Sequence, residues 1–319
     1  MRVSIVIPCY QSEQTLRPLV KAIFAALAEP PAASVVSEFE VVLVVDGSPD
    51  GTADVANQLA AAHPEVRAIE LRRNYGQHNA LLAGITYAKY EVVVTMDDDL
   101  QHRPDQIPAM LAPLARGDAD LVYGVPLEEE HGFWRSAASR TVKRGLALAG
   151  VHAADDVSAF RAFSTAQREG FSQIEDPYVS LDVMLSWTTT SISRVVVQMD
   201  KRLVGTSSYG MRALVRHAIN TINTITGYSN VPLRAVAWLG GLCALLGAVL
   251  GAIVLRNFIA GDTTVAGFTT IAAMVAIFSG AQMLSLGIIG EYIGRLHTRS
   301  TGKPTFLVKT DSEDTNAPE

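Results

Sequence analysis

The N-terminal part of the chain alternates between short apolar runs and segments with helical spacing, and this alternation constrains the fold most. Four runs have the length and apolar character of buried strands: Val3–Ile7, Glu40–Val45, Val66–Leu71 and Glu91–Met96. Helical spacing lies between them, over Leu16–Leu27, Thr52–Ala61 and His78–Ala88. This order predicts an α/β domain with a doubly wound, mostly parallel sheet and right-handed crossovers. A helix over Asp105–Ala115 and a strand over Asp120–Tyr123 are expected to follow.

Three consecutive carboxylates, Asp97, Asp98 and Asp99, follow the fourth apolar run directly, and Gln101 comes two residues later. The carboxyl ends of parallel strands share one edge of the sheet, where open α/β folds bind ligands. Asp97 and Asp99 point the same way along an extended segment. They can therefore bind one Mg²⁺ or Mn²⁺ whose other positions go to phosphate oxygens. For an isolated run of aspartates, a solvated acidic turn is the alternative.

Polar or turn residues also follow the other three strands, and together these ends predict a ligand crevice. The segments are Pro8–Glu13, Asp46–Thr52 and Arg72–Gly76. Asp46 is able to accept hydrogen bonds from a base or a ribose. Arg73 is the natural partner for a pyrophosphate, with an ordinary surface role as the alternative. The chain has no Gly-x-Gly-x-x-Gly after the first strand and no Walker-type Gly-Lys-Ser/Thr, which disfavours a dinucleotide dehydrogenase and a P-loop nucleotidase.

Two segments near the C-terminus, Ala235–Leu255 and Val265–Gly290, contain no charged residue. Each is long enough to cross a hydrocarbon core of roughly 30 Å as a helix, and a pair of buried core helices is the alternative. Basic residues flank the pair on its outer sides, whereas the loop between has only Arg256 against Asp262. The positive-inside rule then places both ends in the cytoplasm. The net charge of -6 argues against a nucleic-acid partner.

The segment 209–232 combines helical spacing and an apolar face with basic residues, immediately before the first apolar segment. It is expected to be an interfacial helix on the cytoplasmic leaflet, with packing against the α/β domain as the alternative. The chain thus divides into an α/β domain over 1–208, an amphipathic juxtamembrane segment over 209–232, two transmembrane helices over 233–292 and a cytoplasmic tail over 293–319.

Six motifs, spread over nearly the whole chain, resemble those of family 2 inverting glycosyltransferases with the GT-A fold. They are Ile5–Tyr10, Asp46–Thr52, Arg73–Ala80, Asp97–Gln101, Arg202–Tyr209 and Gly290–Arg295. The last two are typical of the branch that transfers a sugar from a nucleotide to a polyprenyl phosphate. Within it, the chain is most similar to undecaprenyl-phosphate aminoarabinose transferases and bactoprenol glucosyltransferases, and more distantly to dolichyl-phosphate mannose synthase.

The resemblance implies roles for the matching positions. It makes Asp97, Asp99 and Gln101 ligands of a Mg²⁺ or Mn²⁺ cofactor and of the diphosphate. The nucleotide of a UDP- or GDP-linked sugar would contact Pro8, Tyr10, Glu13, Asp46, Arg73, Asp98, Arg202 and Ser207. The acceptor phosphate would contact Arg135, Ser139, Arg140 and Ser158. Asp155 and Arg161 would act in catalysis together with Asp97 and Asp99.

The resemblance also implies an inner-membrane protein with two spans, a cytoplasmic catalytic domain and a tetrameric assembly, whose lipid-linked product serves envelope or lipopolysaccharide modification. The chemistry agrees, because a phosphate acceptor is already an anion at pH 7 and the main task is to stabilise the leaving diphosphate. One alternative is a processive polysaccharide synthase, although the chain lacks the Gln-x-x-Arg-Trp pattern. The other, a non-catalytic nucleotide-sugar-binding membrane protein, predicts loss of the metal ligands, which are present.

Overall fold

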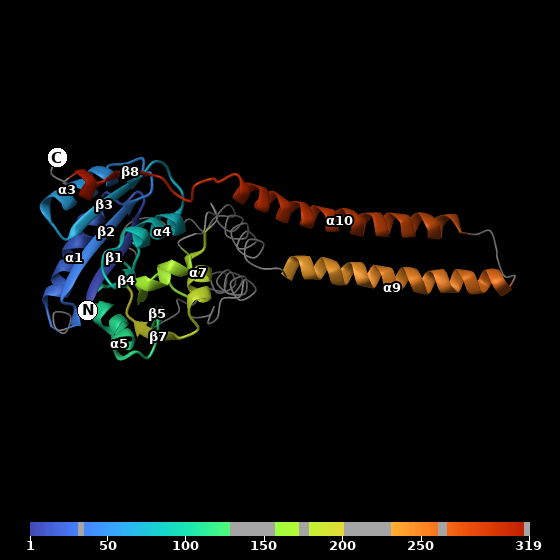
Figure 1. Cartoon of the computed structure of the whole chain (residues 1–319), viewed down its shortest axis with the longest axis horizontal. Helices are drawn as coiled ribbons and strands as arrows, with labels where there is room; N and C mark the ends of the chain where they lie inside the picture. Colours follow the sequence, from blue (N-terminus) through green and yellow to red (C-terminus); the bar gives the residue numbers. More distant parts are fainter. Residues whose placement is uncertain (31–34, 128–156, 172–178, 201–230, 261–266, 316–319) are drawn as a thin grey trace.

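The computed structural model describes residues 1–30, 35–127, 157–171, 179–200, 231–260 and 267–315. Figure 1 shows an α/β domain at one end of an elongated molecule and two long helices that extend away from it side by side. These helices are α9 (Val231–Ala260) and α10 (Phe268–Ser300).

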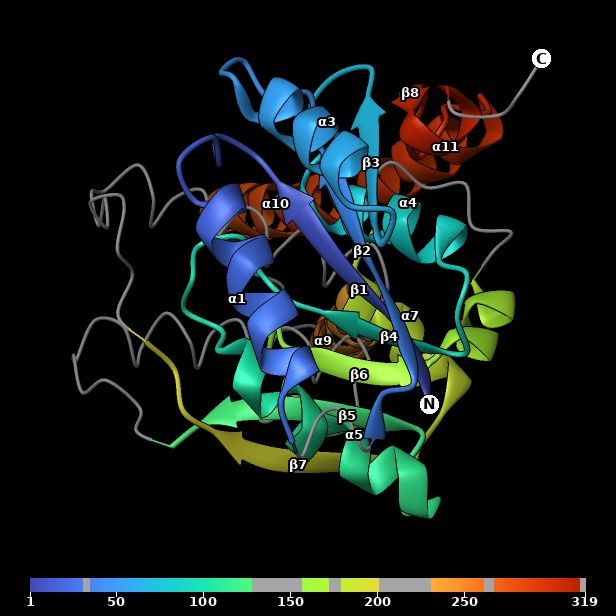
Figure 2. The same cartoon turned by 90° about the vertical axis from the view of Figure 1, so that its left-hand side faces the viewer.

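One eight-stranded sheet with the order β7-β5-β6-β4-β1-β2-β3-β8 forms the centre of the domain, and Figure 2 shows this order from β7 at the bottom to β8 at the top. The strands are β1 (Arg2–Cys9), β2 (Glu38–Val45), β3 (Val66–Leu71), β4 (Val92–Thr95), β5 (Leu121–Pro126), β6 (Arg161–Ser164), β7 (Ile192–Val197) and β8 (Val308–Asp311). Strands β1 to β4 pair in parallel, as do β5 and β7. Strands β6 and β8 are antiparallel to their neighbours. The predicted α/β fold is confirmed, and its sheet is mixed.

Helices cover both faces of this sheet because alternate strand residues point to opposite sides. In β2, Val41, Leu43 and Val45 belong to one core cluster, whereas Val42 and Val44 belong to the other. The first cluster includes residues of α1 (Leu16–Ala28), α3 (Thr52–Ala62) and α5 (Ile107–Arg116). The second includes residues of α4 (Gln77–Tyr87) and α7 (Leu181–Thr188). The shorter elements are two 3₁₀ helices, η1 (Pro104–Gln106) and η2 (Thr165–Gly170), and the helix α11 (Ser312–Thr315).

The predicted helices and strands of the N-terminal part are found, with shifts of one or two residues at most of their ends. Strands β6, β7 and β8 were not predicted from the sequence. Strand β8 changes the description of the C-terminal segment most. Residues 293–319, expected to be a tail, contain the end of α10, then β8 and α11, and β8 pairs with β3 at the edge of the sheet.

Among the described residues, one stretch of helix, Leu233–Ile253, is long and apolar enough to cross a membrane, with a mean hydropathy of 2.2. It lies within α9 and matches the first predicted span. Large apolar side chains are exposed along both α9 and α10, including Trp238, Ile259, Met283 and Leu296. The predicted amphipathic helix falls outside the described residues over 209–230.

Candidate active site

A cavity of about 270 Å³ lies at the carboxyl edge of the sheet, where β1, β2, β3 and β4 end. Its lining comes from the end of β1, from the loops that follow the four strands and from the first residue of α4. The lining residues are Pro8, Tyr10, Asp46, Asn74, Gly76, Gln77, Asp97, Asp98 and Asp99. The crevice predicted from the four strand ends is therefore present, and the three consecutive aspartates face it together.

Hydrogen bonds from two directions hold Asp97 in place. Its Oδ1 accepts from Nε2 of Gln77 at 2.7 Å, and its backbone N–H donates to Nδ1 of His102 at 3.0 Å. The His102 ring is 6% exposed and stacks on Phe160 with centroids 5.3 Å apart. Burial lowers the pKa of His102 to about 4, so at pH 7 its ring is neutral and Nδ1 can accept this hydrogen bond.

The loop that carries these aspartates also contains backbone strain. Leu100 has a φ of 63°, in the left-handed region that non-glycine residues rarely adopt. Beside it, Oδ1 of Asp99 accepts from the backbone N–H of Gln101 at 3.1 Å. Gln11, in the loop after β1, has a φ of 56°. Strained residues of this kind cluster at functional sites, where surrounding contacts enforce the conformation.

Asp98 connects the acidic loop to the loop after β1. Its Oδ2 accepts from the backbone N–H of Tyr10 at 3.2 Å and from the hydroxyl of Ser12. Burial raises the pKa of Asp98, as do the neighbouring Asp97 and Asp99, against the opposing effect of these two hydrogen bonds. Its carboxylate thus lines the cavity while it holds two strand ends together.

Asp46 holds the loop between β3 and α4. Its two carboxylate oxygens accept from the backbone N–H groups of Tyr75 and Gly76, both at 2.7 Å, and the residue is 3% exposed. The next residue, Gly47, has a φ of +56°, and a Cβ there would lie 2.3 Å from the carbonyl carbon of Arg73. The end of β2 therefore packs closely against the loop after β3. Asp46 lines the cavity, and it also fixes the cavity wall.

Five predicted site residues that the structure describes lie outside the cavity lining, namely Glu13, Arg73, Gln101, Ser158 and Arg161. Glu13 accepts from the backbone N–H of Gly51 at 3.2 Å, and Ser158 accepts from that of Phe160 at 3.3 Å. The Arg73 guanidinium lies over the Tyr75 ring, 4.2 Å from its centroid.

Gln101 is held through its backbone. Its carbonyl accepts from the backbone N–H of Asp200 at 2.9 Å, next to a bridge between His102 and Met199. The segment after β7 is thereby attached to the acidic loop.

Arg161 lies in β6 and is 3% exposed. Its Nε and Nη2 donate to the two carboxylate oxygens of Asp182 at 2.7 and 2.8 Å, and the Tyr123 hydroxyl donates to the same carboxylate at 3.2 Å. Although burial opposes both charges, the pairing raises the pKa of Arg161 and lowers that of Asp182. This geometry gives Arg161 a partner inside the core, and it does not support the predicted catalytic role.

Six predicted site residues lie outside the described residues: Arg135, Ser139, Arg140, Asp155, Arg202 and Ser207. Conversely, three residues that line the cavity, Asn74, Gly76 and Gln77, had no individual role predicted from the sequence, although Asn74 and Gly76 lie in a segment expected at the crevice. All three lie within the motif Arg73–Ala80, so their position after the third strand was the available signal.

Comparison with known proteins agrees with this geometry. The model of glycosyl transferase family 2 matches residues 4–171, and the model of the GtrB C-terminal hairpin matches residues 231–296, which cover most of α9 and α10. Among solved structures, glucosyl-3-phosphoglycerate synthase from Mycobacterium tuberculosis has a TM-score of 0.51 and 18% identity over 71% of this chain and 79% of that one. That likeness supports the fold.

Curated relatives match over nearly the full length. The undecaprenyl-phosphate 4-deoxy-4-formamido-L-arabinose transferase of Pectobacterium carotovorum is 30% identical over 96% of this chain and 92% of its own. The protein of the same description from Pseudomonas savastanoi is 31% identical over 96% and 90%. With the family model covering more than half of its residues, the chain belongs to glycosyl transferase family 2 and is a glycosyltransferase.

Proposed function

We propose that this protein transfers one sugar from a nucleotide-sugar to undecaprenyl phosphate, or a similar polyprenyl phosphate, at the cytoplasmic leaflet of the inner membrane. The observation that carries this proposal is that the acidic cavity lies close to the attachment of the apolar helix α10. The cavity lies at the carboxyl edge of the sheet, and the chain enters β8 from α10 at that same edge. Relatives named as undecaprenyl-phosphate transferases match both the domain and the helix pair.

The carboxylate side chains that line the cavity are suitable ligands for a divalent cation. Asp97 and Asp99 supply carboxylate oxygens. In the described part of the chain, no three His, Cys, Asp or Glu side chains are placed so that they could hold a metal ion by themselves. Such a site suits Mg²⁺ or Mn²⁺, which keep positions for waters and substrate phosphates. The mycobacterial synthase was solved with Mn²⁺ and UDP-glucose, which agrees with this choice. When bound, the ion would stabilise negative charge on the departing nucleoside diphosphate.

The chain's own residues would position the reactants. Gln77 and His102 hold Asp97, so the carboxylate is oriented before the donor binds. Tyr10 is 46% exposed at the cavity and offers a ring face to a base. Because the acceptor phosphate is already an anion, its attack on the sugar needs no strong general base, and holding the two anions in line is the main requirement.

The remaining predicted residues keep their proposed roles on the grounds of family resemblance. For the nucleotide these are Glu13, Arg73, Arg202 and Ser207, and Gln101 remains a proposed metal ligand. For the acceptor phosphate they are Arg135, Ser139, Arg140 and Ser158, with Asp155 as a further catalytic candidate. The tetramer also remains a proposal.

The arrangement of the sheet favours two membrane-spanning helices over one. Strand β8 follows α10 in the chain and pairs with β3, so strands that precede α9 and a strand that follows α10 belong to one sheet. If α9 crosses the bilayer, α10 has to cross back. The basic flanks then favour a cytoplasmic domain. Cysteines placed at Ala260 and Thr301 should label from opposite sides of the membrane, and labelling of both from one side would contradict two spans.

The activity can be tested with the purified full-length chain in lipid nanodiscs that contain undecaprenyl phosphate. A panel of UDP- and GDP-sugars, each with Mg²⁺ or Mn²⁺, is screened for release of nucleoside diphosphate. We expect release with a restricted set of donors, and only when the lipid phosphate is present. Release without the lipid, or no release with any donor, would refute the proposal.

A further inference from the structure

The chain after α10 returns to the catalytic domain as a short segment, residues 304–315, that we call the C-terminal strap. Its strand β8 runs antiparallel to β3, with Val308 opposite Leu71 and Asp311 opposite Ile69. The carbonyl of Leu307 accepts from the backbone N–H of Arg72 at 2.9 Å. The strap thus pairs with β3 along the side that β2 leaves free.

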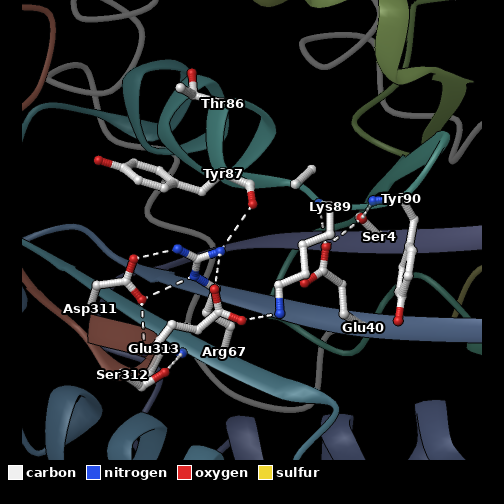
Figure 3. Close-up of polar contacts among 12 residues, drawn as sticks. Ser4, Glu40, Arg67, Thr86, Tyr87, Lys89, Tyr90, Asp311, Ser312 and Glu313 are labelled. Carbon is white, nitrogen blue, oxygen red and sulfur yellow. Dashed lines mark hydrogen bonds and ion pairs between the residues drawn. The ribbon is translucent and has the colours of Figure 1, made fainter. Parts of the chain in front are cut away.

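A buried ion pair attaches the strap to the sheet (Figure 3). Nε and Nη2 of Arg67 donate to the two carboxylate oxygens of Asp311 at 3.0 and 2.6 Å, and Nη1 donates to the Tyr87 carbonyl at 3.2 Å. Arg67 is 9% exposed and Asp311 is 5% exposed. Although burial opposes the charge, Asp311 raises the pKa of Arg67. Each residue therefore depends on the other for its charge to be tolerated in the interior.

Further contacts around this pair come from the end of the strap. The Ser312 hydroxyl accepts from the backbone N–H of Ala68 at 3.0 Å. Glu313 pairs with Arg67 at 2.8 Å and with Lys89 (Figure 3). By contrast, the pair between Lys309 and Glu70 at 2.7 Å involves a half-exposed lysine. Exposed pairs of that kind contribute little, so Lys309 offers a matched control on the same strand.

The connection between α10 and β8 is short enough to limit how far the end of α10 can lie from the cavity. Only residues 301–307 separate α10 from β8, and they can span at most about 25 Å. Because β8 is antiparallel, it begins beside the carboxyl end of β3. The loop that follows this end supplies Asn74, Gly76 and Gln77 to the cavity wall. The cavity edge of the sheet is thus the edge connected to α10.

We propose that Arg67 and Asp311 are positioning residues for sugar transfer. They lock the strap to the sheet, and the locked strap holds the cavity at the height and orientation where a membrane-embedded phosphate can reach the donor. This inference rests on the proposed function, because it assumes a lipid phosphate acceptor. If the pair positions the domain, its loss should impair transfer to an acceptor in the membrane more than transfer to a soluble acceptor. If the pair only stabilises the fold, its loss should impair both equally.

The experiment compares two acceptors for the full-length chain in nanodiscs. One acceptor is undecaprenyl phosphate in the same disc, and the other is a short-chain, water-soluble prenyl phosphate. The variants are Asp311→Ala, the exchange Arg67→Asp with Asp311→Arg, and the control Lys309→Ala. UDP affinity, measured by calorimetry, reports on the donor side of the cavity. Any donor accepted by the wild type serves for the kinetics.

For Asp311→Ala we expect kcat/KM for undecaprenyl phosphate to fall by about tenfold or more, because a loosely held domain presents its site to the membrane at a lower effective concentration. The value for the soluble acceptor and the UDP affinity should change by less than about twofold. The exchanged pair should recover part of the loss, and Lys309→Ala should match the wild type.

Equal losses on both acceptors, or weaker UDP binding in step with transfer, would overturn the inference and leave the pair a purely stabilising role. Unchanged use of undecaprenyl phosphate would also overturn it. If Asp311→Ala does not fold, the exchanged variant, which keeps both charges, is compared on the two acceptors in its place. A selective loss with undecaprenyl phosphate is again the expected result, and the same outcomes as above would overturn the inference. A wild-type chain that binds UDP yet transfers to neither acceptor would instead refute the proposed function, and this inference with it.

Discussion

Replacing Arg161 with alanine should destabilise the α/β domain without removing a group that takes part in catalysis. The change would leave the buried carboxylate of Asp182 with the Tyr123 hydroxyl but without its two charge-assisted hydrogen bonds from Arg161. Breaking a buried pair by removing one partner costs about 3–5 kcal/mol. For a domain of about 200 residues, each kcal/mol shifts Tm by about 2–4 °C, so Tm should fall by about 6–20 °C.

The assay is thermal unfolding of the full-length chain in nanodiscs, followed by tryptophan fluorescence at a fixed scan rate because unfolding of such chains is often irreversible. The double variant Arg161→Leu with Asp182→Leu is the matched comparison. It removes both charges from the interior and should recover much of the lost stability. An Arg161→Ala variant with an unchanged Tm and a much lower kcat would contradict the structural role and restore the predicted catalytic role of Arg161.

Three further predictions concern the cavity. Asp97→Ala and Asp99→Ala should each lower kcat by about 100-fold or more without a change in Tm, and full turnover in excess chelator would contradict a metal site. Gln77→Ala should lower kcat/KM by about 10–100-fold, partly restored by added Mn²⁺, because Gln77 orients Asp97. His102 has a pKa of about 4 when folded, against roughly 6.5 when unfolded. The unfolded chain therefore binds the proton first, and stability falls as pH drops from about 6.5 to about 4, by about 3 kcal/mol from this residue. Denaturant titrations of wild type and His102→Gln across this range test it, and identical pH slopes would contradict it.

The parallel part of the fold could be predicted because its signals are local. Strand β3 was predicted with its observed bounds, since a run of buried residues between two turns needs no distant partner to be recognised. Strand β8 was missed for the opposite reason. It has four residues, two of them exposed and polar, and its place in the sheet depends on Arg67, 244 positions earlier in the chain. Short, charged edge strands carry little periodic signal.

The candidate site was also predicted only in part. The position of the aspartates after a strand predicted where they lie, and Asp97, Asp98 and Asp99 do share one cavity. The hydrogen-bond partners were beyond sequence reasoning. The motif makes Arg161 a catalytic candidate, whereas the structure places it against Asp182 in the core. Nothing in a linear motif distinguishes an arginine that faces a ligand from one that neutralises a buried carboxylate.

The mass of the lipid product shows whether one sugar is joined to a polyprenyl phosphate. The wild-type chain in nanodiscs is incubated with undecaprenyl phosphate, a divalent cation and a nucleotide-sugar from the screen. The mass of the extracted lipid is then measured by mass spectrometry. We expect a single new species, heavier than the acceptor by one sugar residue and absent with Asp97→Ala. A ladder of masses would indicate a processive synthase, and an unchanged lipid despite donor binding would contradict the proposed transfer.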